Sequence, residues 1–113
     1  FINNIGAAWE LLPGDLPDAF FDSNLVVFGG TALVPNIHAG LGSLVRKARD
    51  HRAITVVNTV YDFLSEKKDP ARPWPLGDTD DTYRYIDLLV MDREEALRLS
   101  GAETVEAALD HFR

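Results

Sequence analysis

The sequence has no cysteine, no long apolar run and few basic residues. Without cysteine the chain forms no disulfide and binds no metal through a thiolate, a composition compatible with the cytoplasm. No stretch of about 18 or more apolar residues occurs, which argues against a membrane-spanning helix. Asp and Glu number 18 against 11 Lys and Arg. The net charge of −7 argues against a nucleic-acid or anionic-membrane partner.

What the sequence does contain is enough apolar material for a folded core. Apolar residues make up 46% of the 113 positions, so we expect a folded domain and not a disordered chain. The sequence starts inside an apolar run at Phe1 and stops at Arg113, at the end of an expected helix. We therefore interpret 1–113 as part of a larger domain.

Short apolar runs alternate with segments of helical periodicity. We expect strands over 1–5, 25–28, 53–57 and 86–91. Helical spacing occurs over 37–48, 93–100 and 105–112, a short helix is expected over 79–85, and a long connection covers 59–78. This order predicts an α/β fold with a parallel sheet, right-handed crossovers and helices on both faces.

The aliphatic run from Ile86 to Met91 ends in a burst of charge. Asp92 and Glu95 then form a D-x-x-E pattern at the start of a helix that Gly101 closes. One interpretation is a capping box between the two carboxylates and the backbone of the first turn. The other is a ligand site, because open α/β sheets bind ligands at the carboxyl ends of their strands. Both can hold together, since capping uses only one edge of each carboxylate.

Other polar residues follow the expected strands at the same edge of the sheet. Gly30 follows the strand over 25–28, and Asn58 and Thr59 follow the strand over 53–57. We therefore place Gly30, Asn58 and Thr59 on one ligand rim with the two carboxylates. The competing interpretations are a plain strand-to-helix turn at Gly30 and a turn cap at Asn58.

The remaining candidate residues give weaker indications of function. The three histidines, at positions 38, 51 and 111, have no metal-ligand spacing, and we expect them to be solvated. No Ser/His/Asp arrangement is readable. Trp74, between two prolines, is expected to pack the long connection down.

Four stretches carry a family resemblance. GAAWELLPGDL (6–16) is similar to G-A-N-A-x-L-x-x-x-D-[LI], and LVVFGGTALVP (25–35) and AITVVNTVYDFL (53–64) follow as two strands with their loops. IDLLVMDREEALRLSG (86–101) is similar to A-D-I-L-x-x-N-x-x-E-A-x-x-L-x-G. In this order and spacing they resemble the ribokinase-like sugar kinases, also called the PfkB carbohydrate kinase family.

The resemblance implies a three-layer ribokinase-like fold and an ATP-dependent transfer of phosphate to a hydroxyl of a sugar or related alcohol. It implies that Asp92 and Glu95 occupy the family's N-x-x-E positions, which help to organise Mg²⁺ and phosphate. The family's G-A-G-D motif with its catalytic Asp is absent, as are the N-terminal sugar-binding glycines and the lid strands. The resemblance thus makes 1–113 the central part of such a kinase, inactive alone, and leaves a homodimer open.

The chain departs from the family at several positions. Asp92 stands where the family has Asn, and Ala8 replaces the Asn of G-A-N. Val60 and Asp62 stand where D-P-N-x-R members have Asn and Arg, so no sugar contact through that Arg carries over. The rival hypotheses are a dinucleotide-binding enzyme domain, which the missing G-x-G-x-x-G disfavours, and a non-catalytic α/β interaction module.

Overall fold

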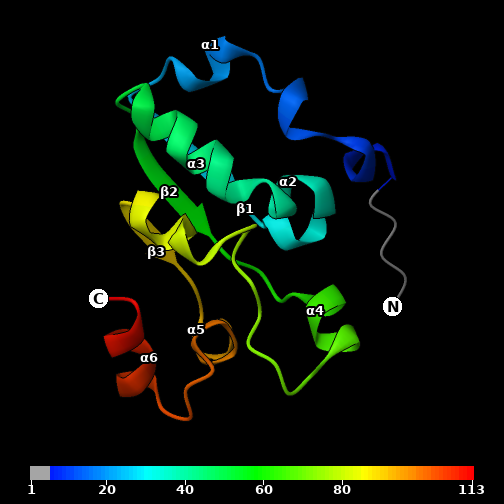
Figure 1. The fold of residues 1–113 in the computed structure, drawn as a ribbon, viewed down its shortest axis with the longest axis vertical. Helices are drawn as coiled ribbons and strands as arrows, with labels where there is room; N and C mark the ends of the chain where they lie inside the picture. Colours follow the sequence, from blue (N-terminus) through cyan, green and yellow to red (C-terminus); the bar gives the residue numbers. More distant parts are fainter. Residues whose placement is uncertain (1–5) are drawn as a thin grey trace.

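A three-stranded parallel sheet forms the centre of the computed structural model, which describes residues 6–113 (Figure 1). The strands are β1 (Leu25–Gly29), β2 (Ile54–Asn58) and β3 (Leu88–Val90), in the order β1-β2-β3. Both pairs are parallel, with Val27 opposite Val56 and Val57 opposite Leu89. The three predicted strands and their parallel pairing are confirmed, and the last is shorter than expected. The strand expected over 1–5 lies outside the described residues.

Short helices connect and follow the strands. They are α1 (Asp18–Phe21), α2 (Pro35–Ala39), α3 (Leu41–Asp50), α4 (Phe63–Lys68), α5 (Arg93–Ser100) and α6 (Val105–His111), with 3₁₀ turns η1 (Gly6–Glu10), η2 (Pro13–Asp15), η3 (Thr31–Leu33) and η4 (Asp80–Tyr85). The helix expected over 37–48 is interrupted at Gly40, where a Cβ would lie 2.5 Å from Cγ of Pro13. Gly101 ends α5 in the left-handed conformation, as predicted. No helix within residues 6–113 is long and apolar enough to cross a membrane.

The hydrophobic core lies between one face of the sheet and helix α3. Alternate strand residues, including Val26, Phe28 and Val57, point into it and are almost fully buried. Helix α3 supplies an apolar stripe at helical spacing, made of Leu41, Leu44, Val45 and Ala48. The 3₁₀ turn η4 packs against α3 on the same side, so both crossovers of the sheet cover one face.

The opposite face of the sheet is bare within the described chain. Its side chains, Leu25, Val27, Ile54, Leu88 and Val90, are 45–56% exposed. The expectation of helices on both faces is therefore wrong for residues 6–113. The cause is topological: the strand order runs in one direction, and right-handed crossovers then place every connection on the same face. Only strands added in the other direction would bring helices to the bare face.

A polar pair fixes β3 to β2 at the amino end of the sheet, away from the rim. The fully buried Thr55 donates its hydroxyl to the carbonyl of Tyr85, at 2.5 Å, and its backbone N–H to Oδ2 of Asp87, at 2.9 Å. The Asp87 N–H in turn donates to the Thr55 carbonyl, at 3.0 Å. The hydrogen bond from the Thr55 backbone, aided by its hydroxyl and by Arg49, lowers the pKa of Asp87.

This pair predicts a pH-dependent part of the stability. The pKa of Asp87 lies below its ordinary value of 3.8, so its carboxylate stabilises the fold above that pH and the contribution is lost as the pH falls through the lower, folded-state pKa. We expect Asp87→Asn, which keeps an acceptor for the Thr55 N–H, to reduce the free energy of unfolding by only about 0.5 kcal/mol at neutral pH, because the carboxylate is partly exposed and solvent screens its charge. Urea unfolding from neutral to acidic pH should show the variant and the wild type converging as the carboxylate protonates.

The control is Asp81→Asn, because the exposed Asp81 carboxylate pairs only with Arg84, at 3.2 Å, and such surface pairs contribute little. A loss in Asp87→Asn that is equally large at every pH would show that the carboxylate charge is not what stabilises this end of the sheet.

Candidate functional site

The residues expected on the ligand rim do lie together. The N–H of Gly30 donates to the carbonyl of Asn58, at 2.9 Å, which joins the ends of β1 and β2. The N–H of Thr59 donates to the carbonyl of Val90, at 2.9 Å, which joins the ends of β2 and β3. The Thr59 hydroxyl donates to Oε2 of Glu95, at 2.5 Å. The parallel sheet thus brings all five predicted positions to one edge.

Asp92 and Glu95 form the capping box predicted for α5. Oδ1 of Asp92 accepts from the N–H of Glu95, at 2.8 Å, and Oε2 of Glu95 accepts from the N–H of Asp92, at 3.1 Å. Asp92 is exposed, whereas Glu95 is only 8% exposed. Among residues 6–113, Oε1 of Glu95 and Oδ2 of Asp92 accept no hydrogen bond. Each carboxylate therefore keeps one oxygen for a ligand.

Gly30 forms the plain turn that the simpler interpretation requires, whereas the Asn58 side chain bonds to the neighbouring strand and not to the turn after β2. Gly30 adopts a left-handed conformation, with φ of 62°, and leads into η3. Because its N–H is bonded to Asn58, that amide is not available to an anion. The Asn58 side chain donates to the carbonyl of Val90, at 3.3 Å, and so joins the end of β2 to the end of β3. On the rim these two residues shape the surface, and the unbonded carboxylate oxygens belong to Asp92 and Glu95.

The long connection after β2 is packed and contains α4. Asp62, 5% exposed, caps this helix by accepting from the N–H of Ser65, at 2.9 Å. Trp74 is 3% exposed and donates its indole N–H to Oε2 of Glu66, at 3.0 Å, as expected for a packing residue. The same Glu66 oxygen accepts from Arg98, whose guanidinium lies over the Trp74 ring. These contacts hold the connection against α5, directly beside the rim.

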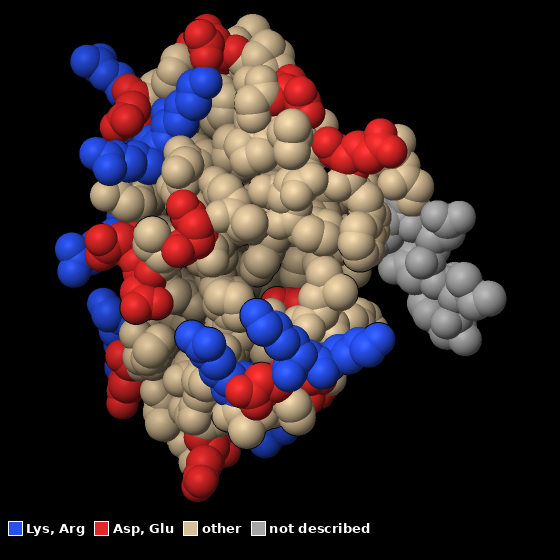
Figure 2. Space-filling view, turned by 45° about the vertical axis from the view of Figure 1, so that its right-hand side comes forward, with Lys and Arg blue, Asp and Glu red and all other residues tan. Residues whose placement is uncertain are grey.

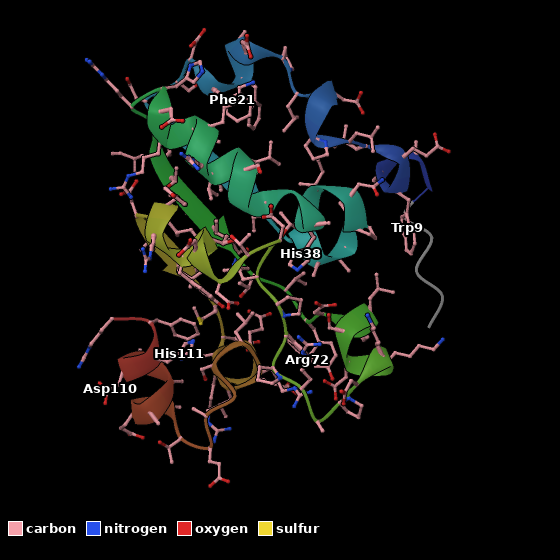
Figure 3. All side chains as sticks on the ribbon, in the orientation of Figure 1. Trp9, Phe21, His38, Arg72, Asp110 and His111 are labelled. Carbon is pink, nitrogen blue, oxygen red and sulfur yellow. The ribbon has the colours of Figure 1, made fainter. Side chains whose placement is uncertain are left out.

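His38 is less solvated than expected, whereas His51 and His111 are exposed as predicted. His38 has only 14% of its side chain exposed and lies within hydrogen-bonding distance of Thr31 and Pro75. His51 lies 2.8 Å from a carboxylate oxygen of Asp22, at the far end of the sheet. His111 packs edge-on against Phe112. The expectation of solvation is wrong for His38, because α2 turns that side of the helix toward the connection that returns from α4 (Figure 3).

The rim is a shelf and not a closed pocket. The space enclosed beneath it, between Thr31, His38, Thr59 and Asp62, is only about 10 Å³. A much larger open groove of about 1100 Å³ lies away from the rim, between the segment around Arg72 and the end of α6. Ligand sites usually enclose several hundred Å³. The rim needs further walls to shield a ligand from water.

Charge is unevenly distributed around this shelf. Lys and Arg side chains gather over α4, in the lower part of Figure 2, although the chain as a whole is acidic. They include Lys67 and Lys68 in the last turn of that helix. No group of three or more His, Asp or Glu side chains suited to a metal ion occurs in the part of the chain that the structure describes. A metal at the rim would therefore be held by the two carboxylates together with ligand phosphates or water.

No protein-family model and no curated protein matches this chain. The expectation of a sugar kinase therefore depends on the motifs in the sequence. Sequence reasoning missed the bond between Thr59 and Glu95 and the contacts of His38. The Thr59–Glu95 and His38–Pro75 contacts join residues 36 and 37 positions apart in the chain, so no local spacing predicts them.

The capping geometry predicts how substitutions at Asp92 act on folding. Asp92→Ala removes the acceptor for the N–H of Glu95 and should lower the free energy of unfolding by about 1 kcal/mol. Asp92→Asn keeps an acceptor and should stay within about 0.5 kcal/mol of the wild type. Urea unfolding measures both. The control is Asp110→Ala on α6, where the carboxylate pairs only with the exposed Arg113. Equal stability of Asp92→Ala and the wild type would contradict the capping role.

Proposed function

We propose that this chain is the central part of a PfkB-type sugar kinase and that its rim helps to bind Mg²⁺ and the phosphates of ATP. The observation that carries the proposal is the bonding of the Glu95 carboxylate. Its side chain is largely buried beyond the carboxyl end of β3, Oε2 accepts from the Thr59 hydroxyl and the Asp92 amide, and within residues 6–113 Oε1 accepts no hydrogen bond. Capping the helix needs only the first oxygen.

The chemistry of the rim suits a hard cation bound to phosphate. Mg²⁺ keeps several waters and binds through one or two carboxylates plus substrate phosphates. Glu95 and the exposed Asp92 would supply such oxygens. The substrates we propose are ATP and a sugar or related alcohol, in a cytoplasmic enzyme.

In this proposal, parts of the whole protein other than residues 1–113 supply the rest of the catalytic machinery. Phosphoryl transfer requires a base for the attacking hydroxyl and walls that exclude water. The shelf supplies neither, so we expect residues 1–113 alone to be inactive. A dinucleotide-binding domain has less support, because the Gly30 amide that would approach a pyrophosphate already donates to Asn58.

The bare face of the sheet fits the proposed three-layer fold. Strands buried in parallel sheets carry apolar residues on both alternations, as β1 does at Leu25, Val26, Val27 and Phe28. A second layer of helices, contributed by other parts of the whole protein, would cover Leu25 and Val27. The sheet would then extend beyond β1, with crossovers running in the opposite direction.

Glu95→Gln tests the proposed role in catalysis. Gln still serves a capping box, so we expect folding to be nearly unchanged. The lost charge near Mg²⁺ and ATP should reduce Mg²⁺-dependent turnover of the whole protein by about 10–100-fold. Steady-state kinetics with ATP and a panel of sugars, at several Mg²⁺ concentrations, measures the effect.

The matched control is Glu94→Gln, which removes an exposed carboxylate from the same helical turn. It should leave turnover almost unchanged. If Glu95→Gln were as active as Glu94→Gln at every Mg²⁺ concentration, Glu95 would have only its capping role.

Val27→Lys tests the proposed second layer of helices. If helices cover this face in the whole protein, the substitution removes a buried Val and buries a charge, at a cost above about 2 kcal/mol. Thermal or urea unfolding of the whole protein measures it. The control is Leu109→Lys on α6, whose side chain is exposed to the same degree, 52% against 53% for Val27. A Val27→Lys protein as stable as the wild type would leave this face uncovered and contradict the three-layer fold.

A further inference from the structure

His38 lies behind the rim and contacts three separate parts of the chain. It belongs to α2, and in Figure 3 it points from that helix toward the segment returning from α4. Its Nδ1 is 3.0 Å from the hydroxyl of Thr31, in the turn after β1. Its Nε2 is 3.1 Å from the carbonyl of Pro75 and 3.9 Å from Oδ2 of Asp62. Thr31 and Asp62 are both at most 6% exposed.

These partners determine where the ring carries its proton. A carbonyl oxygen only accepts, so Nε2 must carry the hydrogen that bonds Pro75. The nearby Asp62 carboxylate favours the proton on the same nitrogen. In the neutral ring Nδ1 is then an acceptor, and the Thr31 hydroxyl donates to it. Of the two neutral forms of the ring, only the Nε2–H form satisfies the three contacts together.

We propose that His38 is a positioning residue, which in this form holds the Gly30–Thr31 turn of the rim to the connection that carries Asp62 and Pro75. That connection begins at Thr59, the hydroxyl of which bonds Glu95. His38 therefore braces both sides of the shelf from beneath, with Gly30 on one side and Thr59 on the other. The effect of His38 on turnover rests on the proposed function. In such an enzyme, a rim displaced by a fraction of an ångström would misplace the reacting groups.

The test uses the whole protein and two substitutions of Thr31, of which Val is isosteric with Thr and Ser keeps the hydroxyl but loses the methyl group. Thr31→Val removes only the hydroxyl donor, whereas Thr31→Ser keeps it. We expect Thr31→Val to reduce kcat/KM for sugar phosphorylation by about tenfold, the equivalent of one hydrogen bond, and Thr31→Ser to stay within about twofold of the wild type. The control is His51→Gln, which removes the histidine bonded to Asp22 at the other end of the sheet and should leave turnover unchanged.

A second readout does not depend on activity. Nitrogen-15 NMR of labelled histidine should show His38 protonated on Nε2 at a pH where the ring is neutral, and Thr31→Val should shift the Nδ1 resonance and the amide signals of Trp74 and Leu76, which flank Pro75. If the protein showed these shifts but had no kinase activity, the proposed function would be wrong and the positioning role of His38 would stand. A proton on Nδ1, or equal effects of Thr31→Val and Thr31→Ser, would overturn the proposal for His38.

Discussion

The handedness of the crossovers is the constraint on which the rest of this structure depends. Three parallel strands added in one direction bring their carboxyl ends to one edge and all their connections to one face. The first consequence creates the rim, where Thr59 meets Glu95. The second buries Val26 and Val57 beneath α3 and leaves Val27 exposed on the other face. A polar shelf and an uncovered apolar face therefore have the same topological origin.

Glu95 shows how one side chain can serve both the fold and a site. Its Oε2 accepts from the Asp92 amide and from the Thr59 hydroxyl, so the carboxylate ties α5 to the end of β2. These bonds hold the side chain in one place while Oε1 remains unbonded in the described chain. A carboxylate fixed in this way pays little entropy on binding a cation. The contacts that cap the start of α5 thus also fix the Glu95 carboxylate in place on the rim.

Local patterns in the sequence predicted the strands and helix ends, because these depend on residues that are close together in the chain. The apolar runs predicted the three strands, and the spacing of Asp92, Glu95 and Gly101 predicted both ends of α5. Contacts between distant segments, such as that of His38 with Pro75, could not be predicted, because no periodicity links them. Apolar residues on both alternations of β1 favour burial on both faces. The covering layer cannot come from residues 6–113, because their crossovers all fall on one side.

The most direct measurement places the metal on the rim without relying on turnover. Mn²⁺ would replace Mg²⁺ in the whole protein with ATP bound, and NMR would record the paramagnetic broadening of backbone amides. Glu95 and Asp87 lie just beyond opposite ends of β3, so they form an internal comparison. A metal at the rim predicts that the amides of Thr59 and Glu95 broaden strongly and that the amide of Asp87, which lies farther from the rim, broadens less. Equal broadening at the two ends of the strand, or none at Glu95, would contradict it.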